Sequence, residues 1–599
     1  MQDIAENYYK KRLVEFESDL KKVKKTIFYF YLLRLFLFIV CIAFLVFFIK
    51  HSYEYIFLIA SITSFISLLF IVKLNLKFSH KEVFISNRIL INKNELKYLK
   101  HQYEAHETGE EYSNLNPHLA ADFDIFGKGS LYQYLNRSLT KAGKTKFAED
   151  LCKSQLNADV IRSKQKAIEE LSGKIDFIQI FRANAMTVNE NGNELINLQL
   201  WINESTKKIK LLKFLSVIFP LILFVWIIMI FCNIITYQSL ILPVLINLFI
   251  IYLNLKTTNN AHAKLGKTAQ ILNKYASIIK LIEEEDFKSP YLTDLKKQLQ
   301  YKDIKASTSL QSLFRLLNAF DFRFNVVVGF VLNALLLFDI QVLCRLEKWK
   351  EKHKSILSLW FSTLAEIDAM LGFATFAFNN QDNVCYPEIA EDEFVFDATD
   401  IGHPLLLPEI RINNSLYFSG NPSVVIITGA NMAGKSTFIR TLSVNMILAM
   451  NGAPVCASKL IFTPSDIMSS IKIQDSLYNN ESYFYAELIR LKEIMNHANT
   501  NPRTIIFLDE ILRGTNTKDK QTGSLGLLEN LISQNAIVVI ATHDLVIGEL
   551  EKKFPGIVAN YCFEVELTND QLIFDYKLKN GITNKLNASF LMKKMGIIQ

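Results

Sequence analysis

Four long apolar runs occur in two pairs along this 599-residue chain. The first pair is Ile27–Ile49 and Tyr55–Val72, and the second is Phe214–Ile235 and Leu240–Leu255. Each run approaches the roughly 20 residues that an α-helix needs to cross about 30 Å of hydrocarbon. Only a few residues separate the two members of each pair. The pattern therefore predicts two transmembrane helical hairpins, four spans in all.

Lysines flank the outer ends of both predicted hairpins, whereas the two short loops carry at most Lys50. The flanking lysines are Lys21, Lys22, Lys24, Lys25, Lys73, Lys77, Lys207, Lys208, Lys210, Lys213 and Lys256. Positive charge gathers on the cytoplasmic side of membrane helices. We therefore expect an integral protein of the inner, cytoplasmic membrane, with both termini and residues 74–210 in the cytoplasm.

A fifth apolar run, Val326–Phe338, is interrupted by Asn333 and followed by Asp339. A fifth crossing would place everything after it outside the cell. We therefore expect this run to form a buried helix of the soluble part.

The remaining pattern separates a helical region from an α/β region. From about Ala261 to Asn379 the chain has few prolines and glycines and places apolar residues at helical spacing, which predicts long helices forming a lever or stalk. After Pro387, short β-branched runs such as "PSVVIIT", "RTIIFLD" and "NAIVVIAT" alternate with helical segments. The predicted fold class is multidomain: transmembrane hairpins, an α-helical lever and a C-terminal α/β domain.

Composition agrees with membrane segments and a reducing setting. Half of the residues are hydrophobic and 21% are charged. The net charge of +7 could reflect a polyanionic partner, but the positive flanks of membrane helices raise the same count. The seven cysteines include no C-x-x-C pair, so neither a zinc site nor a disulfide framework is indicated.

A glycine-rich stretch joins one predicted strand to a helix. Gly429-Ala-Asn-Met-Ala-Gly434-Lys435-Ser436 fits the P-loop pattern G-x-x-x-x-G-K-[ST]. In such a loop the backbone N–H groups surround nucleotide phosphates, the lysine reaches the β- and γ-oxygens, and the hydroxyl holds Mg²⁺. A structural glycine turn is the alternative. Because strand and helix stand where the pattern requires them, we expect ATP and Mg²⁺ as cofactors.

Two further strands end in residues suited to the same site. Asp509 and Glu510 follow "IIFL", where a metal-binding carboxylate and a water-activating base would lie. His543 follows "AIVVIAT" and would contact the γ-phosphate; a core histidine is the alternative. The predicted catalytic residues are Lys435, Glu510 and His543, and the predicted metal ligands are Ser436 and Asp509.

Four ordered motifs resemble the MutS family of DNA mismatch-repair ATPases, which belongs to the ABC ATPase class. They are "TGANMAGKSTFIR", "DSLYNNESYFYAELIRLKEIM", "LDEILRGTNTKD" and "ATHD". The resemblance implies a nucleotide site formed by Gly429, Ala430, Asn431, Met432, Ala433, Gly434, Lys435, Ser436 and Thr437. It also implies that Ser482 contacts the γ-phosphate held by a partner subunit, in a homodimer with composite ATP sites. Taken alone, Ser482 would be a solvated serine at a helix start.

The resemblance extends into the helical region, with departures. Residues 122–151 look like the start of the family's helical core, and residues 577–597 look like its C-terminal helical extension. The core begins by about residue 115, so the usual mismatch-reading domain has no room before it. Leu512 stands where the family usually has glycine. The expected domains begin with a cytoplasmic tail (1–26), a first hairpin (27–73), a cytoplasmic segment (74–210) and a second hairpin (211–256). A helical lever (257–385), the ATPase domain (386–565) and a helical dimerisation extension (566–599) follow.

Three functions fit this sequence. The first is a membrane-anchored, dimeric ATP-dependent clamp whose ligand, by family analogy, is DNA. The second is a membrane-remodelling or transport ATPase that uses the same ATPase domain without DNA. The third is a scaffold whose ATPase only controls dimerisation. No groove of interleaved basic and aromatic residues indicates nucleic acid, and fold analogy alone does not establish the ligand.

Overall fold

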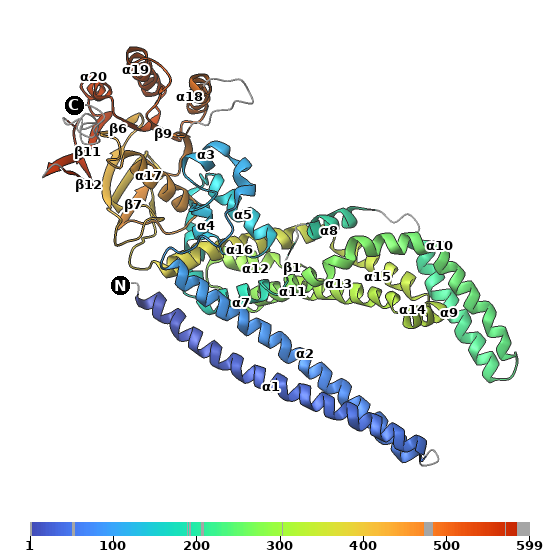
Figure 1. The fold of residues 1–599 in the computed structure, drawn as a ribbon. Coiled ribbons are helices and arrows are strands. Elements are labelled where there is room, and N and C mark those ends of the chain that lie inside the picture. Colours follow the sequence, from blue (N-terminus) through green and yellow to red (C-terminus); the bar gives the residue numbers. More distant parts are fainter. Residues whose placement is uncertain are drawn as a thin grey trace.

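The protein has an elongated arrangement in which an α/β domain lies at one end and two helical hairpins project from a helical body (Figure 1). The computed structural model describes residues 3–50, 54–188, 190, 193–204, 209–301, 304–472, 483–568 and 571–583. The chain contains helical parts and an α/β domain, which confirms the predicted multidomain combination of helices and α/β structure. The membrane crossings stay a prediction.

Hairpin 1 consists of α1 (Asp3–Lys50) and α2 (Tyr55–Tyr98). At 1.5 Å per residue, each helix extends well beyond the thickness of a bilayer. Phe16 and Val23 of α1 pack against Ile85 and Ile89 of α2, next to the helical body. The expected tail at residues 1–26 is therefore, from Asp3 on, continuous with the apolar part of α1.

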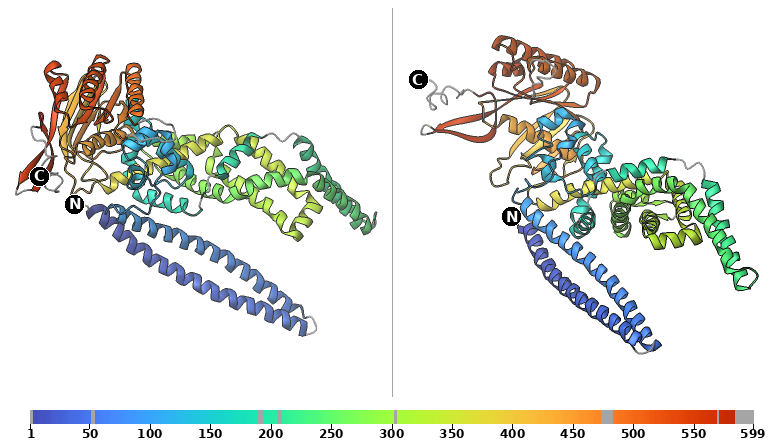
Figure 2. Two further views of the ribbon diagram at one scale, coloured as in Figure 1. Left: turned by 45° about the horizontal axis from the view of Figure 1, so that its top comes forward. Right: turned by 45° about the vertical axis from the view of Figure 1, so that its right-hand side comes forward.

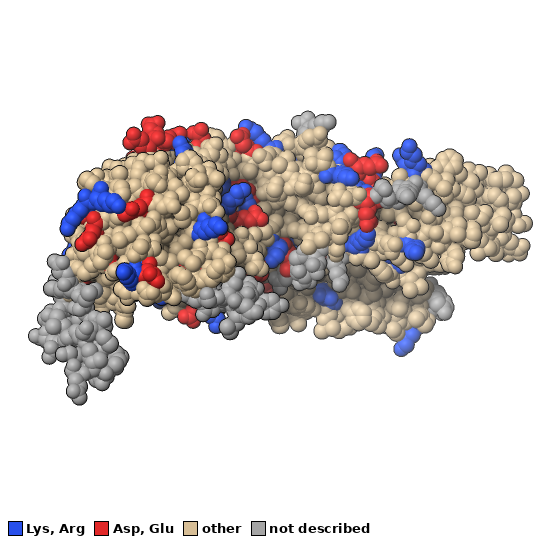
Figure 3. Space-filling model, turned by 90° about the horizontal axis from the view of Figure 1, so that it is seen from above, with Lys and Arg blue, Asp and Glu red and all other residues tan. Residues whose placement is uncertain are grey.

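Hairpin 2 consists of α9 (Ile209–Phe231) and α10 (Ile241–Leu265), joined through the short helix η2 (Tyr237–Leu240). Both hairpins point in the same general direction in every ribbon view (Figure 2). The end of the molecule formed by hairpin 2 shows no charged side chain when seen from above (Figure 3). This agrees with the sequence, in which residues 214–255 contain no Lys, Arg, Asp or Glu.

Five described helices are long and apolar enough to cross a membrane: α1, α2, α9, α10 with η2, and α16 (Leu357–Asn379). In α16, 83% of the most apolar window is buried inside the protein, against at most 22% in the other four. The four hairpin helices are therefore the exposed candidates for membrane spans, whereas α16 is a buried helix of the protein core.

The helical body contains α16, which packs mainly against α5, α6 and α12. Its other elements are η1 (Glu110–Leu115), α3 (Pro117–Asp122), α4 (Leu131–Leu135), α5 (Lys141–Cys152), α6 (Ala158–Ser172), α7 (Ile175–Ala185), α8 (Asn193–Asn203), η3 (Gly266–Thr268), α11 (Ala269–Glu284), α12 (Pro290–Gln298), β1 (Gln300–Tyr301), β2 (Ile304–Lys305), α13 (Ala306–Phe320), η4 (Asp321–Phe324), α14 (Val326–Leu336) and α15 (Phe338–His353). The expectation of long helices over Ala261–Asn379 is confirmed, although the small β1–β2 pair interrupts them.

The expectation of a buried helix at Val326–Phe338 is wrong. The helix forms as α14, but only Gly329, Asn333 and Ala334 are buried in it. Val326 is 83% exposed and Phe330 is 57% exposed. The polar residues that interrupt the run point inward, and the apolar residues point outward.

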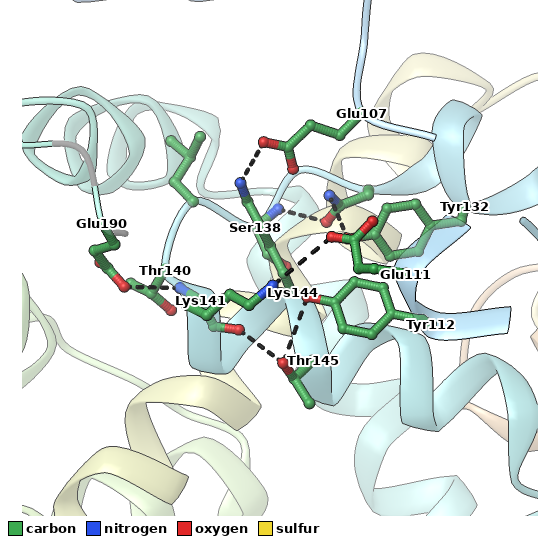
Figure 4. Close-up of polar contacts among 12 residues, drawn as sticks. Glu107, Glu111, Tyr112, Tyr132, Ser138, Thr140, Lys141, Lys144, Thr145 and Glu190 are labelled. Carbon is green, nitrogen blue, oxygen red and sulfur yellow. Dashed lines mark hydrogen bonds and ion pairs between the residues drawn. The ribbon is translucent and has the colours of Figure 1, made fainter. Parts of the chain in front are cut away.

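Polar contacts hold the start of α5 against its neighbours (Figure 4). The N–H of Lys141 donates to Glu190 at 2.9 Å. On α16, the buried carboxylate of Asp368 accepts both the N–H and the hydroxyl of Thr140, at 2.9 and 2.7 Å. The segment that resembles the family's core is thereby tied to α16.

The C-terminal domain is built on a six-stranded sheet in the order β12-β11-β6-β10-β9-β8, beside a four-stranded sheet in the order β3-β7-β4-β5. The strands are β3 (Glu388–Ile389), β4 (Val395–Ile401), β5 (Asn414–Ser419), β6 (Ser423–Gly429), β7 (Lys459–Phe462), β8 (Asp466–Ser470), β9 (Thr504–Asp509), β10 (Ile537–Thr542), β11 (Val558–Thr568) and β12 (Gln571–Asn580). The helices are α17 (Lys435–Met450), α18 (Tyr483–Thr500), α19 (Thr517–Ser533), η6 (Leu545–Glu549) and α20 (Leu550–Lys553).

The central strands of the large sheet are parallel and buried on both faces. Val425 and Ile427 face the core that contains α17, whereas Val424 and Ile426 face the core that contains α18 and α19. Double burial explains why these strands are continuous apolar runs in the sequence.

The expected helical extension at residues 566–599 needs a correction. Residues Gln571–Asn580 form β12, which pairs with β11 in an antiparallel hairpin. Apolar and polar residues alternate over "FDYKLK", residues 574–579, which is typical of a β-strand. Residues 584–599 lie outside the described part of the chain.

The helical body contacts the sheet directly. Phe123, fully buried, packs edge-to-face on Phe507 of β9 with 6.1 Å between ring centroids. Asp124 forms an ion pair with Arg440 of α17 at 3.0 Å. A displacement of β9 or α17 would therefore move the residues of the helical body that contact them.

Candidate nucleotide site

The glycine-rich loop lies between the end of β6 and the start of α17. A Cβ on Gly429 would lie 2.8 Å from the carbonyl oxygen of Phe563, so the neighbouring strand β11 excludes a side chain there. Gly434 has a φ of 104°, which only glycine adopts without strain, and its position directly precedes α17. The loop therefore exposes backbone N–H groups at a helix N-terminus, where anions bind.

Lys435 lies folded across this loop. Its ammonium group donates to the carbonyl oxygens of Gly429 and Ala430 at 2.7 and 3.0 Å. Burial lowers its pKa from the ordinary value, and the nearby carboxylate of Glu510, 3.9 Å away, opposes this. The amine is thus held beside the space that the loop surrounds.

Asp509 ends β9 with its side chain buried beside Ser436. Burial raises the pKa of its carboxyl group, and a hydrogen bond from Ser436 opposes this. Its Oδ1 atom has no hydrogen-bond partner among the described residues. A carboxylate with an unused oxygen next to a hydroxyl fits Mg²⁺, which binds one or two protein oxygen atoms and keeps several waters.

Glu510 and His543 meet at the carboxyl edge of the sheet. Nδ1 of His543 lies 3.5 Å from Oε1 of Glu510, and Arg513 lies 3.5 Å from Oε2. The backbone of Glu510 has a φ of 47° and its N–H donates to Ala541 of β10. A left-handed residue at the end of a strand is strained, and such strain is often found at functional sites.

A cavity of about 680 Å³ opens over the loop. Of the predicted site residues, it is lined by Ala430, Asn431, Met432, Gly434, Lys435, Ser436, Thr437 and Glu510. Gly429, Ala433, Asp509 and His543 are close in the chain or in space but do not line it. Ser482 lies outside the described residues.

Comparison with known proteins shows what this domain is similar to. Residues 425–594 match the family described as MutS domain V. The C-terminal part of the chain is therefore similar to the MutS family. Similar proteins include the DNA mismatch repair protein MutS of Chlorobium phaeovibrioides, 33% identical over 37% of this chain and 25% of that protein. MutS of Thermotoga maritima is 31% identical over 41% and 31%, and MutS protein homolog 4 of Mus musculus is 30% identical over 41% and 26%.

The resemblance read from the motifs is thereby confirmed. The chain spans about a quarter to a third of the length of these curated relatives. The likeness to MutS therefore concerns the end of the chain that carries the loop and the cavity.

Glu487 is a residue of the α/β domain that sequence reasoning missed. Its carboxylate, 1% exposed, accepts the N–H of Leu512 at 2.6 Å. Leu512 has a φ of 59°, a left-handed conformation that glycine adopts with less strain than leucine. The only signal in the sequence is an acidic residue among the apolar positions of "YFYAELIRL".

His403 and Tyr576 were also missed. Both line the cavity, from loops and strands distant in sequence from the glycine-rich loop. Burial, reinforced by the charge of Arg440, lowers the pKa of His403 to about 4, so this histidine is neutral at physiological pH. The motif "GHPLL" contains His403, but nothing in the pattern places it beside the loop.

Proposed function

We propose that the chain is a membrane-anchored P-loop ATPase of the MutS family, in which ATP binding and hydrolysis at this cavity drive a dimeric clamp. One observation carries the proposal: the unpartnered oxygen of Asp509 lies beside Ser436, at the end of a loop that presents Lys435 and free space for a nucleotide.

The residues take the following roles. Lys435 releases the loop carbonyls and binds the β- and γ-phosphate oxygens, while the loop N–H groups bind the rest of the phosphate chain. Ser436 and Asp509 would hold Mg²⁺, which would supply charge neutralisation at the phosphates. Glu510 removes a proton from the attacking water, and His543 contacts the γ-phosphate.

The composite site needs a second copy of the chain. Met432, at the cavity, has a φ of 67° and a side chain that is 78% exposed. An exposed large apolar residue in a left-handed conformation at the mouth of a site suits a surface that a partner covers. We place Ser482 of the second copy opposite the γ-phosphate and Arg513 between the two sites.

Membrane anchoring by the hairpins is supported by their length, their exposed apolar surfaces and the lysines at their inner ends. We place the α/β domain and both termini in the cytoplasm, with the hairpin tips on the other side.

DNA is the proposed ligand of the clamp, after the relatives named DNA mismatch repair protein. A membrane-remodelling or transport ATPase is the second candidate. It is favoured by the direct contact of both hairpins with the helical body, because lever movement would then act on the membrane.

The deciding experiment is ATP hydrolysis by the full chain in nanodiscs, with linear, mismatched and branched DNA at two salt concentrations. We expect Glu510→Gln to lower kcat by at least about 100-fold, as expected for loss of a general base, and to retain ATP binding. Glu549→Gln, an exposed carboxylate of the same domain, should be unaffected.

The dependence on DNA distinguishes the two candidates. Stimulation of ATP hydrolysis by DNA that weakens as the salt concentration rises supports the DNA clamp. Protein contacts with DNA phosphates release counterions, so added salt weakens DNA binding. Hydrolysis that depends on Glu510, ignores every DNA and responds to lipid composition contradicts the clamp on DNA. Equal hydrolysis by Glu510→Gln and the unmodified protein contradicts the proposed site.

A further inference from the structure

Helix α14 and the turn η4 before it form an apolar surface that the other described elements leave uncovered. Its exposed large side chains include Phe322, Phe324, Val326, Val327, Phe330 and Val331. Residues 324–338 contain no charged side chain. Soluble proteins rarely leave so contiguous an apolar patch in water.

This surface lies alongside hairpin 2. Asn247 of α10 donates its side-chain N–H to the carbonyl oxygen of Ala334 at 2.8 Å. Gln341, just after α14, lies 3.4 Å from the carbonyl oxygen of Ser216 in α9. Asn247 and Ser216 both belong to the predicted spans, so α14 contacts hairpin 2 within its apolar part (Figures 1 and 2).

Backbone carbonyl groups near the C-terminal end of α14 accept hydrogen bonds from side chains of the protein. The last carbonyl groups of a helix lack intrahelical partners and usually bind water. Here Asn247 binds the carbonyl of Ala334, and Gln341 binds that of Leu336 at 2.8 Å. The side chain of Asn333 accepts the N–H of Asp339 at 2.9 Å. Such internal pairing is what a hydrocarbon environment demands.

The two charged residues that flank α14 are paired with each other. Arg323 lies 3.3 Å from Asp339, and both side chains are under 10% exposed. Arg323 also donates to Asn259 of α10 at 2.7 Å. Between the segment Ala306–Phe324 and α14 the chain bends by 108°. Buried charges beside an apolar helix in a membrane are expected to be paired in this way.

We propose that α14 enters the cytoplasmic leaflet beside hairpin 2 and returns without crossing, so that Phe330 and its neighbours contact lipid acyl chains. With 11 residues, α14 is about 16 Å long, roughly half of the hydrocarbon thickness. The inference rests on the proposed membrane placement of α9 and α10. Lipid is favoured over a second copy of the chain because the surface continues the uncharged face of hairpin 2.

The consequence concerns the lever. Helices α13 and α15 flank α14 in the chain and pack against each other and against hairpin 2. A lever movement driven from the α/β domain would shift α14 within the leaflet, and lipid packing would in turn resist that movement.

Photolabelling of the full chain tests this placement. The protein is reconstituted in phosphatidylcholine–phosphatidylglycerol vesicles that include a lipid with a diazirine in the middle of the acyl chain, irradiated, and mapped by mass spectrometry. We expect label on Val327 and Phe330 comparable with that on Phe224 of α9, an exposed residue of hairpin 2. Tyr417 of β5, equally exposed in the α/β domain, is the negative control.

The outcomes separate this inference from the membrane anchor. Label on Phe224 without label on α14 overturns the inference and leaves the anchor. Absence of label on both overturns both.

A pair of variants gives an independent test at one residue. Phe330→Asp should lower labelling of α14 about tenfold, because an ionised carboxylate is expensive in hydrocarbon, whereas Phe330→Leu should leave it unchanged. Equal labelling in both variants would overturn lipid contact at Phe330.

Discussion

At the residue scale, the site depends on two backbone positions as much as on its chemical groups. Glu510 and Leu512 both have positive φ, and neither is a glycine. The carboxylate of Glu487 binds the N–H of Leu512 and so holds the turn that follows Glu510. We infer that Glu487 positions the proposed base without contacting the substrate.

Glu487→Ala removes the acceptor and leaves a buried N–H unpaired, which costs about 1–3 kcal/mol. We expect kcat for ATP hydrolysis to fall about 10- to 100-fold through misplacement of Glu510, with little change in KM. Glu487→Gln keeps an acceptor oxygen and should retain most activity. The exposed Glu493 on the same helix supplies the control, Glu493→Ala. An unchanged kcat in Glu487→Ala would refute the positioning role.

At the element scale, α2 joins hairpin 1 to α16 through one buried cluster. Glu95 near its end binds Arg137 at 2.8 Å and Arg182 at 2.6 Å. Asn379 of α16 donates to Glu95 at 3.1 Å and accepts the hydroxyl of Tyr9 from α1 at 2.8 Å. Hairpin 1 is therefore fixed to the lever at the point where α16 leads into the α/β domain.

Burial opposes ionisation of Glu95, but the charges of Arg137 and Arg182 lower its pKa to about 2. Because this pKa is below that of the unfolded chain, the carboxylate stabilises the fold above about pH 4.3 and loses this contribution as the pH falls toward 2. Glu95→Gln should lower the free energy of unfolding by about 3–5 kcal/mol, since it leaves two buried guanidinium groups without their counter-charge.

Thermal unfolding in detergent at neutral and acidic pH measures both effects. Glu104→Gln, at an exposed site in the loop after α2, is the control. An unfolding midpoint for Glu95→Gln equal to that of the control would contradict the cluster's role.

At the scale of the whole molecule, the proposed topology places the two hairpin tips on the side opposite the nucleotide site. Cys232, exposed directly after α9, is a native reporter of one tip. We expect a membrane-impermeant maleimide added to intact cells to label it, and Cys232→Ser to abolish that labelling. Labelling that appears only after lysis would reverse the proposed orientation.

The sequence by itself determined the features that depend on local order. The continuous strands around Val425 and Val539, the loop from Gly429 to Ser436 and the lengths of the apolar runs follow from period, spacing and turn chemistry. The motif order likewise indicated the resemblance to the MutS family, and the match of residues 425–594 to MutS domain V agrees with it. These features need no knowledge of which distant segments meet.

The tertiary structure decided which side chains face each other and which face solvent. Apolar composition predicted a buried helix at Val326–Phe338, yet α14 turns its few polar and small residues inward because Asn247 and Gln341 bind its carbonyls. Glu487 reaches Leu512 across 25 residues, and β12 forms as a strand because β11 offers it an edge. Burial, hydrogen-bond pairing and edge pairing are set by contacts between distant parts of the chain, so a linear pattern leaves them open.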